Sequence, residues 1–261
     1  MVLEKVQQPV LLIRGLLRES RHWLNFPALL SDRLQTPVLT LDLPGCGALF
    51  RQRSAASVPE LRQQLQQQLL SAYPQYQEQA VHLVAISMGG MLALDWALNA
   101  PEQVKSLVLI NSSSAGLSPF WQRLQPRQYP TILRALVASV EQREALIWNM
   151  TVNKAVESAV LQQWQLWAKQ CPVSRANALR QLWAASRFKV SAVPNCAVTV
   201  LCSDQDQLVS STCSKALAQQ LRAVLSVHPG SGHDLPLDDS EWMLAQLCQH
   251  FDSLHSEVSA L

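Results

Sequence analysis

Three residues of the types that cooperate in nucleophilic catalysis occur in this chain in the order Ser87, Asp206 and His233. A serine hydroxyl is a poor nucleophile at neutral pH, and it becomes reactive when an imidazole takes its proton and a carboxylate orients that imidazole. Each of the three residues follows the end of a different apolar segment. If those segments are parallel strands, their carboxyl ends share one edge of a sheet, where the three side chains can meet. The order therefore predicts chemistry that begins with attack by Ser87.

Ser87 lies at an abrupt change from a strand pattern to a helix pattern. The apolar, β-branched run 81–86 precedes it, and the small-residue run 88–94 follows with no loop residue between them. A backbone reversal within one or two residues exposes the serine hydroxyl, as in a nucleophile elbow. The pentapeptide Ala85-Ile86-Ser87-Met88-Gly89 departs from the G-x-S-x-G pattern at Ala85. The alternative is an ordinary strand–turn–helix with a capping serine.

Two carboxylates and two imidazoles compete for the supporting roles. Asp204 and Asp206 both follow the segment 197–202, and His228 and His233 both follow the segment 224–227. His228 still belongs to the end of its predicted strand, which makes it the weaker candidate for a base. Asp234, next to His233, is expected either to orient its loop or to lie on the surface.

The elements that must position these residues alternate along the chain. Short apolar runs predict strands, and amphipathic runs between them predict helices. Strands alternating with helices indicate a parallel sheet with right-handed crossovers. The predicted strands are 9–13, 37–43, 81–87, 104–110, 197–202 and 224–227, and the predicted helices around them are 22–34, 59–72, 88–99, 211–221 and 239–251.

The alternation stops between residues 119 and 189, where only helices at 131–150, 155–169 and 174–188 are predicted. We therefore expect a core domain made of residues 1–114 and 190–261 and a helical cap of residues 115–189, inserted after the fourth strand. Five of the eight tryptophans lie in this insert, and they either pack it onto the sheet or line an apolar pocket above Ser87. These tryptophans are Trp121, Trp148, Trp164, Trp167 and Trp183.

Five short motifs in this order resemble those of the α/β-hydrolase superfamily. They are Leu12-Ile13-Arg14-Gly15, Asp42-Leu43-Pro44-Gly45-Cys46-Gly47, the Ser87 elbow, Asp204-Gln205-Asp206-Gln207-Leu208-Val209 and Gly232-His233-Asp234-Leu235-Pro236. Among its members the chain is similar to the capped carboxylesterases, the group that includes the pimeloyl-carrier-protein methyl ester esterase. The resemblance implies an α/β fold: a mostly parallel α/β-hydrolase sheet flanked by helices, with an inserted all-helical cap.

The resemblance also implies roles for the site residues. Ser87 would be the nucleophile, His233 the base and Asp206 the orienting acid, because Asp206 precedes Leu208-Val209 as the acid of the family does. The activity implied is cleavage of a carboxylic ester or thioester through an acyl-enzyme. The backbone amides of Met88 and Leu16 would form the oxyanion hole.

One residue departs from the family pattern. Relatives usually carry histidine before the glycine of the first motif, and this chain carries Arg14. Arg14 is expected to brace its loop or face solvent, and the alternative is that it reaches a substrate carboxylate.

Two other functions use the same scaffold. One is a triad-containing lyase of the menaquinone-synthase type, which abstracts a proton without forming an acyl-enzyme. The other is a catalytically silent α/β-hydrolase binding module, which Arg14 and Ala85 favour. A haloalkane dehalogenase is disfavoured, because it needs aspartate at position 87.

Charge is distributed unevenly although the net charge is only +2. Residues 119–189 contain ten basic and three acidic residues, so this segment carries +7 and the rest carries −5. A basic cap would attract a small acyl ester that is anionic or attached to an acidic carrier protein. A solvated helical surface without a partner is the alternative. Nothing in the overall composition suggests a nucleic-acid partner.

Location and cofactors are predicted from what the sequence contains. No apolar run reaches membrane-spanning length, and Met1–Gln8 lacks the apolar core of a signal peptide. The six cysteines form no C-x-x-C pair, which is typical of reduced thiols in a cytoplasmic protein. The histidines at 22, 82, 228, 233, 250 and 255 show no metal-ligand spacing, and no glycine-rich cofactor motif occurs. We therefore expect no metal and no cofactor.

Overall fold

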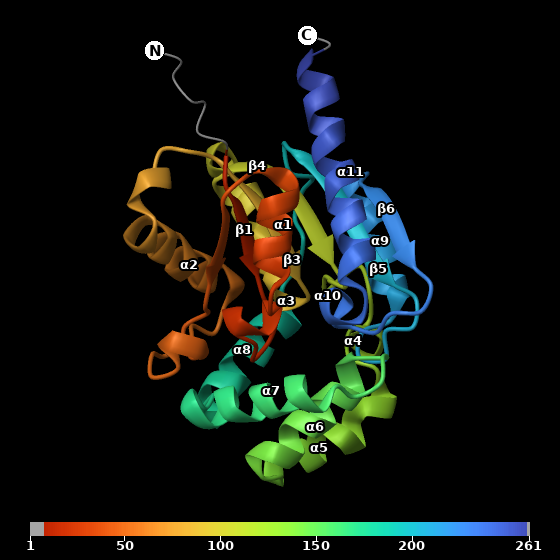
Figure 1. Cartoon of the computed structure of the whole chain (residues 1–261). Helices are drawn as coiled ribbons and strands as arrows, with labels where there is room; N and C mark the ends of the chain where they lie inside the picture. Colours follow the sequence, from red (N-terminus) through yellow and green to blue (C-terminus); the bar gives the residue numbers. More distant parts are fainter. Residues whose placement is uncertain (1–7, 260–261) are drawn as a thin grey trace.

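The computed structural model describes residues 8–259 and has a six-stranded, all-parallel sheet at its centre (Figure 1). The strands run in the order β2-β1-β3-β4-β5-β6, with the elbow strand β3 between β1 and β4. This confirms the predicted α/β fold with its parallel sheet. The strands are β1 (Val10–Ile13), β2 (Val38–Leu41), β3 (Val81–Ile86), β4 (Val104–Ile110), β5 (Ala197–Ser203) and β6 (Val224–His228).

Alternate residues of the central strands supply two separate apolar layers. In β1, Leu11 and Ile13 join the layer under α2, α3 and α9, while Val10 and Leu12 join the layer under α1 and α11. All four side chains are completely buried, because helices cover both faces of the sheet. The covering helices are α1 (Phe26–Leu34), α2 (Val58–Ala72), α3 (Met88–Asn99), α9 (Ser211–Leu221), the short α10 (Leu235–Asp238) and α11 (Ser240–Ser259).

The segment between β4 and β5 is helical, and in Figure 1 its helices α5, α6 and α7 lie beyond one end of the sheet. We call residues 115–189 the cap segment. Its separation from residues 1–114 and 190–261 as a domain stays a prediction. The helices of the cap segment are α4 (Phe120–Arg123), α5 (Tyr129–Val137), α6 (Val140–Thr151), α7 (Ser158–Gln170) and α8 (Arg175–Arg187).

Several predicted helix boundaries were wrong. The helix predicted at 22–34 begins only at Phe26. Leu24 follows a 3-10 turn and has a φ of 52°, which is not a helical conformation. The helix predicted at 131–150 is two helices. Ser139 begins the second one with a capping box, in which its hydroxyl accepts from the Gln142 amide and the Gln142 side chain accepts from the Ser139 amide, both at 3.3 Å. The 3-10 turns are η1 (Ser20–Trp23), η2 (Gly47–Leu49), η3 (Pro74–Tyr76), η4 (Pro101–Gln103) and η5 (Pro126–Gln128).

Two sequence predictions concern the chain ends and the membrane. The stretch Met1–Gln8, predicted to lack a signal peptide, lies outside the described residues except for Gln8. Among the described residues, no helix combines the length and the apolar character that a bilayer crossing requires.

Candidate functional site

Ser87 occupies a strained turn between β3 and α3. Its φ is 57° and its ψ is −122°, a combination that a residue with a Cβ rarely adopts. The Ser87 amide donates to the Ile110 carbonyl of β4 at 2.8 Å, and the Ser87 carbonyl accepts from the Ser112 hydroxyl at 2.8 Å. These bonds hold the backbone in the reversal that the sequence predicts, and the side chain stays partly exposed.

Two glycines allow other backbone to approach this turn. A Cβ built on Gly15 would lie 2.9 Å from the Ser87 Cβ, and one built on Gly89 would lie 2.6 Å from the Ile13 and Arg14 carbonyl oxygens. Any larger residue would push the loop after β1 away from Ser87. The loop that begins at Arg14 therefore packs directly against the serine.

His233 and Asp206 form a hydrogen bond between two loops that are 27 residues apart in sequence. The His233 Nδ1 lies 2.6 Å from the Asp206 Oδ2, and both residues are buried. The other carboxylate oxygen, Oδ1, accepts from the amides of Leu208 at 2.8 Å and Val209 at 2.9 Å. The carboxylate is thus fixed by its own loop while it orients the imidazole.

The protonation of His233 reflects opposing effects. Burial disfavours the charged imidazolium, but the negative charge of Asp206 and its hydrogen bond outweigh burial, so the pKa of His233 lies above its ordinary value. Two further charges act on it in opposite directions. The carboxylate of Asp234 raises the pKa of His233, and the guanidinium of Arg14 lowers it.

Asn111 connects the loop of His233 to the end of β4, which is hydrogen-bonded to Ser87, although the sequence suggested no role for it. Its Nδ2 donates to the His233 carbonyl at 2.9 Å, and the preceding residue, Ile110, accepts from the Ser87 amide. Asn111 is buried, and its φ is 46°. Asparagine is enriched among residues that adopt such positive φ, and this one directly follows a strand on the site edge. That combination is the signal that could have identified it.

Leu16 and Met88 are the sequence neighbours of Gly15 and Ser87, the two residues that meet at the serine turn. Met88 is the first residue of α3, so no carbonyl one turn earlier is available to its N–H. Leu16 follows Gly15, in a tight turn where the Arg18 amide donates to the Gly15 carbonyl at 3.2 Å and Leu17 has a φ of 62°. The close contact between Gly15 and Ser87 brings the Leu16 residue to the serine as well.

Arg14 and Asp234 form a buried ion pair, which corrects two sequence expectations. Arg14 does not face solvent and Asp234 does not lie on the surface, because they are 3% exposed each. The guanidinium binds the carboxylate through two hydrogen bonds, Nη1 to Oδ1 at 3.1 Å and Nη2 to Oδ2 at 2.5 Å. A bidentate pair compensates the cost of burying both charges better than a single contact. Arg14 therefore braces its loop.

The competing candidates Asp204 and His228 lie elsewhere. Asp204 is exposed and pairs with Lys215 at 2.9 Å. His228 ends β6, and its Nε2 lies 3.1 Å from the Asp239 Oδ2. Neither is hydrogen-bonded to His233.

The cap segment contacts three loops at the sheet edge on which Ser87 lies. The Gln181 side chain of α8 accepts from the Leu17 amide at 3.1 Å, and the Gln125 side chain donates to the Asp206 carbonyl at 2.8 Å. The carbonyl of Thr151, the last residue of α6, accepts from the Asp234 amide at 2.7 Å. The cap segment is thus hydrogen-bonded to the loops after β1, β5 and β6.

The tryptophans of the cap segment divide into two groups. Trp148 and Trp164 are fully buried, with ring centres 5.1 Å apart, and they pack with Leu237 of α10, while Trp167 packs against this cluster and is partly buried. Trp121 and Trp183 are more than half exposed. Trp148 and Trp164 join the cap segment to the rest of the molecule, in agreement with the prediction that tryptophans pack the insert onto the sheet.

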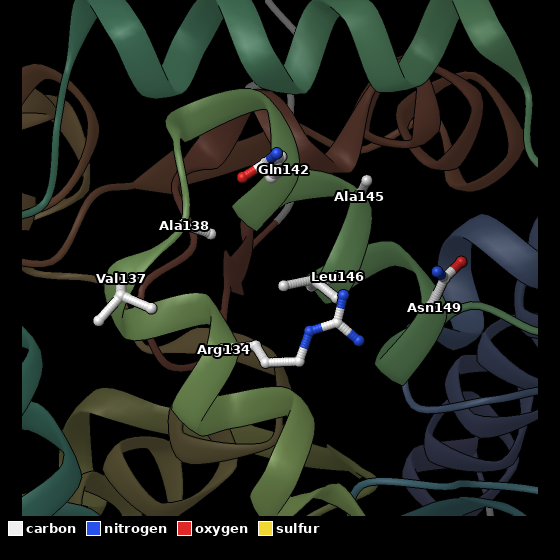
Figure 2. Close-up of a pocket in the computed structure, with 7 residues that line it drawn as sticks. All are labelled: Arg134, Val137, Ala138, Gln142, Ala145, Leu146 and Asn149. Carbon is white, nitrogen blue, oxygen red and sulfur yellow. The ribbon is translucent and has the colours of Figure 1, made fainter.

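A hollow of about 400 Å³ lies between α5 and α6 (Figure 2). None of the predicted site residues lines it. Its lining residues are Arg134, Val137, Ala138, Gln142, Ala145, Leu146 and Asn149. Among the described residues, no group of three or more His, Cys, Asp or Glu side chains is arranged to hold a metal ion.

The chain is similar to several proteins of known structure. It matches a membrane phospholipase A described as a bacterial virulence factor, with a TM-score of 0.78 and 19% identity over 96% of this chain and 80% of the other. It also matches a 2-hydroxy-6-oxo-6-phenylhexa-2,4-dienoate hydrolase from Rhodococcus sp. strain RHA1, with a TM-score of 0.75 and 19% identity over 94% and 91% of the two chains. Identities this low support the fold alone.

Sequence comparison identifies a relative and a family. The dihydrolipoyllysine-residue acetyltransferase component of the acetoin cleaving system from Pseudomonas putida is 34% identical over 118 residues, which are 45% of this chain and only 30% of that protein. The model of the alpha/beta hydrolase family matches residues 10–246. Because that match spans the sheet and the cap segment together, the chain belongs to the α/β-hydrolase family.

Proposed function

We propose that this protein is a serine hydrolase that cleaves a carboxylic ester or thioester through an acyl-enzyme. The observation that carries the proposal is the 2.6 Å bond between His233 and Asp206, on the same sheet edge as the strained Ser87 turn. In this mechanism His233 takes the proton of Ser87, which attacks the substrate carbonyl. His233 then protonates the leaving group and activates the water that releases the acid.

The amides of Met88 and Leu16 are proposed to stabilise the negative charge that develops on the substrate oxygen. Fixed backbone donors are effective because they need no rearrangement as the charge forms. The position of Met88 at the start of α3 and the packing of the Gly15 turn on Ser87 support this assignment.

We also propose that residues 115–189 act as a cap domain over a core of residues 1–114 and 190–261. The hydrogen bonds of Gln181, Gln125 and Thr151 support a cap over the site, since they join the cap segment to loops that carry proposed site residues. The six free cysteines support a reducing compartment, such as the cytoplasm.

The charge of the cap segment supports a substrate that is anionic or carried on an acidic protein. To test this, Arg134, Arg175 and Arg187, which are exposed on α5 and α8, would be changed together to glutamate. We expect KM to rise for an anionic ester and to stay unchanged for a neutral one. Arg33→Glu, at an exposed position of α1 outside the cap segment, is the control for a charge reversal elsewhere on the surface. If the triple variant and wild type had equal KM values for the anionic ester, the proposal would be refuted.

The central experiment is labelling with a fluorophosphonate probe, with wild type beside Ser87→Ala, followed by mass spectrometry of the adduct. We expect one adduct on Ser87 and none in the variant. Labelling should weaken as the pH falls below the raised pKa of His233, because the protonated imidazole cannot take the serine proton.

The other outcomes separate the alternatives. Folded wild-type protein that takes up no probe would contradict the hydrolase and favour a catalytically silent binding module. Labelling of Ser87 without hydrolysis of any ester or thioester would favour a triad-containing lyase of the menaquinone-synthase type.

A further inference from the structure

Arg14 connects both sides of the proposed site. Its backbone carbonyl packs against α3 next to the serine, where a Cβ on Gly89 would lie 2.6 Å away. Its side chain reaches Asp234, the residue that follows His233, through the bidentate pair described above. Arg14 thereby touches the serine turn with its backbone and the histidine loop with its guanidinium.

Further contacts hold the two partners in place. The Arg14 Cζ lies 4.8 Å from the ring centre of Trp23, within the range of a cation–π interaction. The Asp234 amide donates to the Thr151 carbonyl of α6 at 2.7 Å. With side chains only 4% exposed, neither Arg14 nor Asp234 can replace its partner with bulk water. Separation of the two loops would leave both charges buried without a partner.

We propose that the buried Arg14–Asp234 pair is a positioning device that fixes the loop of His233 relative to the Gly15–Leu16 turn. It would keep the base and the oxyanion donor at a constant spacing around Ser87, and in that respect it rests on the proposed function. The pair does not touch the reacting atoms. It acts through the two loops, which join it to His233 on one side and to Leu16 on the other.

The pair also balances charge beside His233. The charged groups that influence His233 are Asp206, Asp234 and Arg14, and the last two act in opposite directions. Removal of Arg14 alone leaves the Asp234 carboxylate uncompensated, which should raise the pKa of His233. Removal of Asp234 alone leaves the guanidinium, which should lower it. These shifts report the charges of the pair, whereas the rate of labelling reports the spacing that the pair is proposed to hold.

The test compares Arg14→Gln, Asp234→Asn and the double variant with wild type. The pKa of His233 would be followed by NMR titration of isotopically labelled histidine, which needs no substrate, and the rate of fluorophosphonate labelling would be measured on the same samples. We expect the pKa of His233 to move upward in the first variant and downward in the second, and to return toward wild type in the double variant. Labelling should slow about 10-fold or more in each single variant.

Arg62→Gln is the matched control, because Arg62 forms a comparable ion pair with Asp95 at 2.8 Å between α2 and α3. This variant should lower the free energy of unfolding without changing the pKa of His233 or the rate of labelling. If Arg14→Gln does not fold, Arg14→Lys keeps the charge and should retain the wild-type pKa of His233 with slower labelling, because lysine cannot form the bidentate pair.

Folded single variants that are labelled as fast as wild type would overturn the proposal, even if the pKa of His233 shifts. Shifts of the expected signs in a protein whose wild type takes up no probe would refute the hydrolase and reduce the role of the pair to charge balance beside His233.

Discussion

The sheet and helix α5 of the cap segment differ in how far they bury their apolar side chains. The central strands β1 and β3 contribute side chains that are almost all completely buried. In α5, by contrast, no side chain is buried, and its exposed apolar residues include Leu133 at 64% exposure, Leu136 at 55% and Val137 at 84%. The sheet excludes water on both of its faces, whereas α5 exposes apolar side chains to water.

This difference teaches that two kinds of interaction hold the molecule together. Burial of apolar surface stabilises the sheet region in proportion to area. The cap segment is joined to the rest by the cluster around Trp148 and Trp164 and by individual polar contacts such as those of Asn177 and Gln181. We expect the sheet to determine stability and the cap segment to tolerate change on its outer face. The predictions that follow are ordered by expected effect.

The largest effect is expected from Leu83→Ala in β3. Leu83 is completely buried in the layer under α2 and α3, so its truncation leaves a cavity. We expect a loss of about 2–5 kcal/mol in the free energy of unfolding, measured by chemical denaturation. A loss below about 1 kcal/mol would contradict the view that burial in the sheet dominates stability.

Acid should weaken the sheet region through His250. Its imidazole lies between the Thr199 hydroxyl at 2.9 Å and the Ser106 hydroxyl at 2.8 Å, and burial lowers the pKa of His250 to about 4. Between that value and about 6.5 the unfolded chain binds the proton more readily, so the free energy of unfolding falls as the pH decreases, by at most about 3 kcal/mol. His250→Gln should flatten this dependence. Identical pH profiles for wild type and variant would rule out His250 as its source.

A smaller effect is expected from Asn177→Ala in α8. This variant tests whether polar contacts join the cap segment to the core. The Asn177 Oδ1 accepts from the Ser54 amide at 3.0 Å, and its Nδ2 donates to the Gln52 carbonyl at 2.9 Å. Loss of these two hydrogen bonds should lower the free energy of unfolding by about 1–3 kcal/mol and speed proteolysis of the cap segment. Asn149→Ala, on the exposed side of α6, is the control and should change neither. Unchanged proteolysis in Asn177→Ala would show that this contact does not hold the cap segment.

The smallest effect is expected from Leu136→Ser on α5. Because this side chain is already 55% exposed, its replacement should change the free energy of unfolding by less than about 0.5 kcal/mol. Thermal denaturation at two protein concentrations would measure it. A loss above about 1 kcal/mol that depends on concentration would show that the outer face of α5 is covered in solution.

The sequence by itself determined the features that depend on neighbouring residues. The alternation of apolar and amphipathic runs predicted the six strands, and the absence of loop residues around Ser87 predicted its turn, because both follow from local spacing and burial. It also placed Asp206 and His233 in the loops that the structure joins by a hydrogen bond. Helix boundaries were less accessible, since the positive φ at Leu24 and the capping box at Ser139 depend on local geometry that apolar periodicity does not report.

Only the tertiary structure decided which distant groups are partners. Arg14 and Asp234 are 220 residues apart, and Asn111 reaches His233 across 122 residues. Asp204 and Asp206 are nearly equivalent in sequence, yet one pairs with Lys215 on the surface and the other with His233 in the interior. The physical reason is that pairing of charges and hydrogen bonds depends on burial and direction in space, which are defined once the strands have brought their loops to one edge of the sheet.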